Sequence, residues 1–190
     1  MPLGDVPMPP QPERHFHGKV EIILGNEWTA EYFDAEEASP PNDVPMIYGY
    51  ACVVRGDYGY VTERDQARDG WSVVEGNFLE GETAEEFVTR SALEQTGANI
   101  SQTLLIGYLD CRATSANEHY EKHFRAIRPM YVGVAREVGP VPEGSDYHRR
   151  RLPMNQFQNE LRKRYSLLSD HFAKGLSRYT ILERTGKLKS

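Results

Sequence analysis

The hydrophobic positions of the chain follow a helical period in two places. A T-x-x-E capping box at Thr83, an apolar stripe after it and Gly97 as a stop signal predict one helix. Apolar residues then recur with spacings of 3, 4, 4, 3 and 4 over residues 154–172. With Pro153 before them and Gly175 after them, they predict a second amphipathic helix.

Shorter apolar runs between polar or glycine-bearing segments predict strands. They cover residues 19–24, 46–55, 58–63, 103–110 and 126–138. Gly56-Asp57 predicts the turn of a hairpin, and Cys111–Arg125 reads as a long polar linker. Strands followed by a helix, more strands and a last helix predict an α/β fold with a mixed sheet between helices.

Length and composition indicate one ordinary domain. The chain has 190 residues, of which 39% are hydrophobic, enough for a single packed core. We expect a proline-rich N-terminal arm over residues 1–17, a domain over residues 18–176 and a tail over residues 177–190. No apolar run approaches the roughly 18 residues of a membrane span, and residues 1–17 show no signal-peptide pattern. Two cysteines far apart in the sequence suit a reducing cytoplasm.

Charge is distributed unevenly along the chain. Residues 148–190 hold 11 Lys and Arg against 3 Asp and Glu, whereas residues 1–147 hold 11 against 25. The acidic body argues against a general nucleic-acid binder. It suits a metal site or a cation-binding surface, or it is ordinary solvated surface. Arg149–Arg151 would grip an anionic partner or form a solvated turn, and we expect the turn.

One stretch carries a chemical signature, residues 76–98, GNFLEGETAEEFVTRSALEQTGA. It resembles the Nudix box, G-x5-E-x7-R-E-U-x-E-E-x-G-U, where U is a bulky aliphatic residue. Five fixed positions fall in register: Gly76, Glu82, Arg90, Glu94 and Gly97. The resemblance implies the Nudix-type α/β/α sandwich. It also implies that Gly76, Glu82, Arg90 and Gly97 have structural roles in the box.

The resemblance further implies a metal-dependent reaction. Nudix enzymes hydrolyse nucleoside diphosphates linked to another moiety, by water attack at phosphorus with Mg²⁺ or Mn²⁺. The family's three box glutamates lie at i, i+3 and i+4 on one helix face, and here those positions are Ser91, Glu94 and Gln95. Glu94 is therefore the expected catalytic residue and metal ligand, with Ser91 and Gln95 as neutral ligands. Glu75 precedes the box glycine, where the family's backbone approaches the metal, and is the fourth candidate ligand.

Alternative interpretations accompany these candidates. Glu94 is equally a rung of an i, i+4 ladder with Glu86 and Arg90. Arg64 is a candidate phosphate ligand or a surface arginine. Tyr48, with Trp28 and Tyr50, could stack on a nucleobase or pack under a helix. Additional metal ligands could come from the linker residues Glu118, His119, Glu121 and His123, or from His15 and His17.

Two functions remain open from the sequence. The first is a divalent-metal-dependent Nudix hydrolase with two of its three box glutamates replaced. The second is a catalytically inactive Nudix-fold module that binds a nucleotide-like small molecule or has a regulatory role. A third, an interaction domain, would use the acidic body or the basic C-terminal region. Many members of the family form homodimers, so a dimer is a further expectation.

Overall fold

The computed structural model describes residues 20–23, 26–65, 70–116, 118 and 120–188. Its elements are β1 (Val20–Ile23), β2 (Asn26–Asp34), β3 (Tyr48–Arg55), β4 (Tyr58–Arg64), β5 (Val74–Asn77), α1 (Ala84–Thr96), β6 (Ala98–Ala113), β7 (Arg125–Val138), β8 (Tyr147–Pro153), α2 (Met154–Arg164) and α3 (Ser169–Arg184). Residues 1–17, the expected N-terminal arm, lie outside the described residues.

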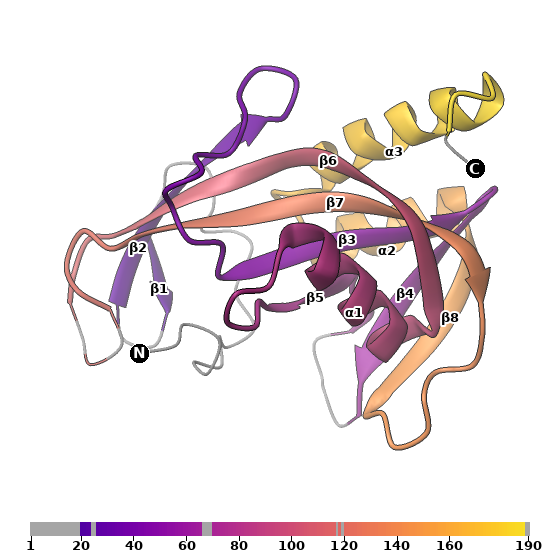
Figure 1. Ribbon diagram of the computed structural model, residues 1–190, viewed down its shortest axis with the longest axis horizontal. Helices are drawn as coiled ribbons and strands as arrows, with labels where there is room; N and C mark the ends of the chain where they lie inside the picture. Colours follow the sequence, from indigo (N-terminus) through magenta and orange to yellow (C-terminus); the bar gives the residue numbers. More distant parts are fainter. Residues whose placement is uncertain (1–19, 24–25, 66–69, 117, 119, 189–190) are drawn as a thin grey trace.

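The strands form one mixed sheet. Seven of its eight strands follow the order β1-β2-β6-β7-β3-β4-β8, and β5 pairs with β3 beside this path. The β3–β7 pair is parallel, whereas the other strand pairs are antiparallel. Figure 1 shows α1 on one side of the sheet and α2 and α3 on the other. The predicted fold, a mixed sheet between helices, is confirmed.

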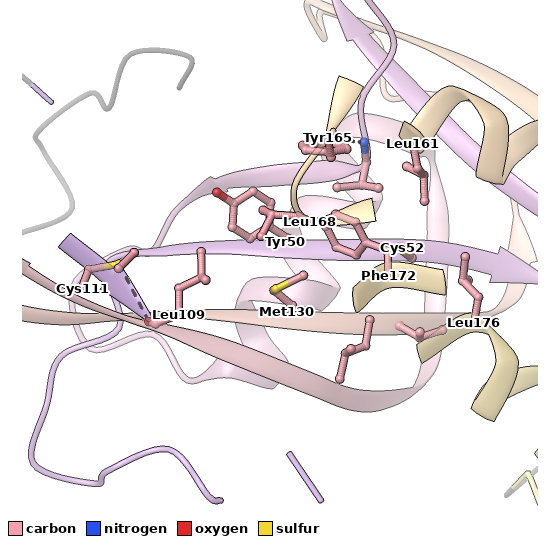
Figure 2. Close-up of a cluster of buried hydrophobic side chains, with 14 of the residues drawn as sticks. Tyr50, Cys52, Leu109, Cys111, Met130, Leu161, Tyr165, Leu168, Phe172 and Leu176 are labelled. Atoms are coloured by element: carbon pink, nitrogen blue, oxygen red, sulfur yellow. Dashed lines mark hydrogen bonds between the residues drawn. The ribbon is translucent and has the colours of Figure 1, made fainter. Parts of the chain in front are cut away.

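Each sheet face has its own hydrophobic core. The core under α1 includes Phe78, Phe87 and Val88. The core under α2 and α3 is larger, and Figure 2 shows its helical residues against the sheet residues Tyr50, Cys52 and Met130. Both cysteines, Cys52 and Cys111, are buried in this second core as free thiols. Among the described residues, no helix has the length and apolarity to cross a membrane.

Helix α1 begins and ends where the sequence predicts. The Thr83 side chain accepts from the Glu86 amide, and the Glu86 side chain accepts from the Thr83 amide. Gly97 ends the helix with a left-handed φ of 73°. A Cβ atom there would also lie 2.4 Å from the Pro140 carbonyl oxygen, so both conformation and close approach require glycine.

The predicted C-terminal helix is two helices. The apolar spacing continues across the break at residues 165–168 because Tyr165 and Leu168 stay buried in the same core. Gly175 does not end the second helix. It lies inside α3, where a Cβ atom would come within 2.4 Å of Ile106. Because α3 continues to Arg184, the expected boundary at residue 176 falls inside it.

Strand β8 differs most from the sequence prediction. Residues 149–151 were expected to form a solvated turn, but they pair with residues 60–62 of β4. The alternation of the strand sends Arg149 toward the end of α1, where it donates to the Thr96 carbonyl at 2.7 Å. Strands β6 and β7 also extend into the predicted linker, which spans only residues 114–124.

Candidate functional site

The loop between β5 and α1 is fixed by an ion pair between Glu82 and Arg90. Arg90 donates from Nε to Glu82 Oε1 at 2.5 Å and from a terminal nitrogen to Oε2 at 2.9 Å. Arg90 also donates to the Asn77 carbonyl at 3.2 Å, and the Leu79 amide donates to Glu82 at 2.9 Å. Burial alone would raise the pKa of the Glu82 carboxyl, but these hydrogen bonds outweigh it and lower the pKa. The first half of the box therefore shapes its own loop.

The second half of α1 turns Ser91 and Gln95 toward the sheet, where both are buried. Gln95 Nε2 donates to the backbone carbonyl oxygen of Glu75 at 2.9 Å. Because a carbonyl oxygen only accepts, the amide nitrogen of Gln95, and not its oxygen, faces β5. A Cβ atom built on Gly76 would have only this nitrogen nearby, at 4.0 Å.

The Glu75 carboxylate points to the sheet face that carries α2 and α3. Glu75 is paired with Tyr50 between β5 and β3, and directly paired residues project on the same side. There its carboxylate accepts a hydrogen bond from the Tyr48 hydroxyl at 2.8 Å and another from the Tyr165 hydroxyl. Burial, and then the Glu75 carboxylate, raise the pKa of Tyr48 well above its usual range, so its hydroxyl remains a donor. Glu75 thus joins the box strand to the connection between α2 and α3.

The comparisons with known proteins identify the fold. No family model and no curated protein matches this chain. The solved structure of a point mutant of the Bacillus subtilis pyrophosphohydrolase BsRppH is similar to it, with a TM-score of 0.54 and 17% sequence identity. The match covers 87% of this chain and 95% of that chain. This chain has the Nudix fold.

Two further Nudix structures have lower TM-scores. A Nudix hydrolase from Nitrosomonas europaea has a TM-score of 0.48 and 14% identity, covering 68% of this chain and 87% of its own. The Nudix domain of Shewanella oneidensis NrtR, in complex with ADP-ribose, has a TM-score of 0.49 and 13% identity, covering 73% of this chain and 94% of its own. The similarity to BsRppH, at 17% identity, shows the fold alone.

The box residues of this Nudix fold do not fit a divalent cation. Mg²⁺ and similar ions are held by several oxygen atoms, in which carboxylates supply most of the affinity. Glu94 faces outward and pairs with Arg90 at 3.2 Å. Gln95 presents a nitrogen, and the Glu75 carboxylate accepts from two tyrosines. Over the described residues, no group of three or more His, Cys, Asp or Glu side chains could hold a metal ion.

The two substrate candidates have different surroundings. Arg64 is exposed, with a terminal nitrogen 3.9 Å from Asp146 and its guanidinium 5.9 Å from the Tyr147 ring. Tyr48 is half-buried, and its ring lies 5.5 Å from the guanidinium of Arg128. No hydrogen bond or ring contact between described residues joins Arg64 to Tyr48. The exposed position of Arg64 fits the surface interpretation, whereas Tyr48 belongs to a buried polar cluster.

This cluster contains residues that the sequence did not single out. Arg128 is only 1% exposed and Tyr120 only 3%. Trp28 meets Tyr120 edge to face, with a ring distance of 5.0 Å. Burial raises the pKa of Tyr120, and the positive charge of Arg128 partly opposes this shift. Trp28 and Tyr120 belong to the core under α2 and α3, and Tyr48 packs against the same core. We call Trp28, Tyr48, Tyr120 and Arg128 the aromatic wall.

A signal for part of the aromatic wall was present in the sequence. Arg128 interrupts the apolar run AIRPMYVGV of β7, and charged residues are rarely buried in a strand without a specific role. Tyr120 lies in a linker with no periodic pattern, so only the fold brings it to Trp28. The other linker candidates, Glu118, Glu121 and His123, are exposed. His15, His17 and His119 lie outside the described residues.

Proposed function

We propose that this Nudix-fold protein binds an anionic, nucleotide-like small molecule and does not hydrolyse it through a box-bound metal. The observation that carries the proposal is the engagement of the box oxygens. The Glu75 carbonyl accepts from Gln95, and the Glu75 carboxylate accepts from Tyr48 and Tyr165. Glu94, the one carboxylate at the three candidate ligand positions of the box helix, is paired with Arg90. The oxygen atoms that would bind a metal ion to activate a water molecule are thus already engaged in contacts within the protein.

The aromatic wall supports the binding half of the proposal. It places the positive charge of Arg128 beside the ring of Tyr48, a combination that suits a phosphate next to a base. The indole nitrogen of Trp28 is buried and has no hydrogen-bond partner among the described residues. A buried donor without a partner is costly, and an acceptor on a bound ligand would relieve that cost. Because the wall is largely buried, ligand entry requires a local opening.

Calorimetric titration tests both halves of the proposal. ADP-ribose, a dinucleoside polyphosphate and a nucleotide sugar are titrated in EDTA and in MgCl₂, and each ligand is recovered and analysed by chromatography. We expect at least one to bind with the same affinity in both buffers and to be recovered intact. Metal-dependent cleavage that Glu94→Ala abolishes would instead establish the hydrolase.

A pair of tryptophan variants locates the binding. Trp28→Phe removes the indole N–H but keeps most of the aromatic volume. Loss of one hydrogen bond to the ligand should weaken binding about 2- to 10-fold. Trp71→Phe is the matched control, because Trp71 is partly buried but lies outside the aromatic wall. Equal effects of the two substitutions would place the ligand elsewhere.

A further inference from the structure

We infer that the Gln95 side chain takes the place of a cation between helix α1 and strand β5. The box then holds these two elements together without a bound metal. The Gln95 side chain is 5% exposed, and its amide nitrogen lies 2.9 Å from the Glu75 carbonyl oxygen. An amide N–H is a neutral donor that satisfies a carbonyl oxygen as a bound cation would. The inference concerns stability and does not require the ligand proposed above.

The backbone of the last turn of α1 supports this assignment. The final carbonyls of a helix have no partner within the helix, and a helix end carries partial negative charge. Here each of the four is satisfied by a protein donor. The pairs are Leu93 with the Gly97 amide at 3.0 Å, Glu94 with the Ser145 hydroxyl at 2.9 Å, Gln95 with the Thr62 hydroxyl at 3.1 Å, and Thr96 with the Arg149 guanidinium at 2.7 Å.

Three of these four donors come from outside the box. Thr62 is on β4, Ser145 precedes β8, and Arg149 is on β8. Thr62 is only 1% exposed, and its hydroxyl also lies 3.2 Å from the His148 carbonyl. The cation at this helix end is therefore the guanidinium of Arg149, and the Gln95 amide completes the set on the side of β5.

Replacing the amide nitrogen of Gln95 by oxygen should make the contact between α1 and β5 depend on a cation. Gln95→Glu is nearly isosteric, but it places a carboxylate oxygen against the Glu75 carbonyl oxygen, and two acceptors repel each other. Only a cation or a proton between them removes the conflict. Ser91 lies one turn earlier on the same helix face, so Ser91→Glu supplies a second carboxylate beside the first.

Thermal unfolding in EDTA, MgCl₂ and MnCl₂ tests the inference. The Tm of the wild-type protein should be the same in all three buffers. Gln95→Glu should lower the Tm in EDTA by roughly 5–10 °C, and the divalent ions should restore part of this loss. The Ser91→Glu, Gln95→Glu double variant should show the larger metal-dependent increase.

Two controls separate a cation requirement from a simple loss of packing. Gln95→Met removes the donor without adding charge, so its Tm should fall and should not respond to metal. Gln156→Glu makes the same chemical change at an exposed position of α2 and should leave the Tm unchanged in every buffer. A wild-type Tm that rises with Mg²⁺ would overturn the inference, even if no variant folds. Gln95→Glu with wild-type stability in EDTA would also overturn it. Neither result depends on ligand binding, so this test stands even if none of the three ligands binds.

Discussion

The two halves of helix α1 use opposite strategies. The N-terminal half makes its contacts within the box, where Arg90 holds Glu82 and Thr83 caps the helix. The C-terminal half makes its contacts outside the box, through Gln95 to β5 and through Arg149 of β8. The first half matches the Nudix signature, whereas the second half differs from it at Ser91 and Gln95. One helix is therefore fixed at its start by residues of the box and at its end by residues of other strands.

The strongest test of this comparison removes the ion pair of the first half. Arg90→Met keeps the apolar stem but leaves the carboxylate of Glu82, whose side chain is only 6% exposed, without its partner. We expect a loss of about 3 kcal/mol in the free energy of unfolding, because a buried charge is left uncompensated. Chemical denaturation measures it, and a matching loss for Gln95→Met would erase the distinction between the halves.

The same variant predicts a pH dependence. The pKa of Glu82 is lowered in the folded protein, so its contribution is fully present above the unfolded carboxyl pKa of about 4.3. It is lost as the pH falls through the lower, folded value. The stability difference between the wild-type protein and Arg90→Met should therefore shrink between pH 5 and pH 3. A difference that stays constant over this range would show that Arg90 acts through packing alone.

A third prediction contrasts two glycines that face each other in the sheet. Gly49 and Gly76 are direct partners between β3 and β5. A Cβ atom on Gly49 would come within 2.5 Å of the Phe87 ring, whereas on Gly76 it would meet only Gln95 Nε2 at 4.0 Å. Gly49→Ala should cost about 2 kcal/mol through overpacking. Gly76→Ala should stay within about 0.5 kcal/mol of the wild type. Thermal melts of the two variants measure the contrast. A large loss of stability for Gly76→Ala would show that the box glycine is needed for more than the absence of a side chain.

A small effect is also expected at Glu94, the one glutamate among the three box positions expected to bind a metal. Its side chain is 56% exposed, and its pair with Arg90 is an i, i+4 contact at the surface. Glu94→Gln should change the free energy of unfolding by less than about 1 kcal/mol, because exposed ion pairs contribute little. It should also leave ligand affinity unchanged in EDTA and in MgCl₂. An affinity loss confined to MgCl₂ would reveal a metal at this position.

The sequence predicted features with local causes. The caps of α1, the β3–β4 hairpin and the mixed sheet between helices depend on nearby residues and on hydrophobic period. The break between α2 and α3 was missed because Tyr165 and Leu168 keep their spacing through it. Strand β8 was missed because three consecutive arginines hide its alternation, and Arg149 finds its partners only in the folded chain.

The candidate site was less predictable, for a related reason. The resemblance to the Nudix box placed Glu75, Ser91, Glu94 and Gln95 at one expected site, but it does not say which atom of each residue is used. The carbonyl of Glu75 faces Gln95, whereas its carboxylate faces two tyrosines. One of these, Tyr165, is 90 residues away in the chain. Contacts across such separations are set by topology, and no pattern within the box encodes them.

The two buried cysteines allow local opening of the core under α2 and α3 to be measured by thiol labelling. Cys52 has none of its surface exposed and Cys111 only 2%. Burial raises the pKa of the Cys52 thiol, and only a thiolate is a strong nucleophile. In the closed state both thiols are therefore chemically silent. At neutral pH a small thiol reagent therefore reacts only while a strand of the core under α2 and α3 is separated from its neighbours. The rate of labelling then counts those openings without any added probe.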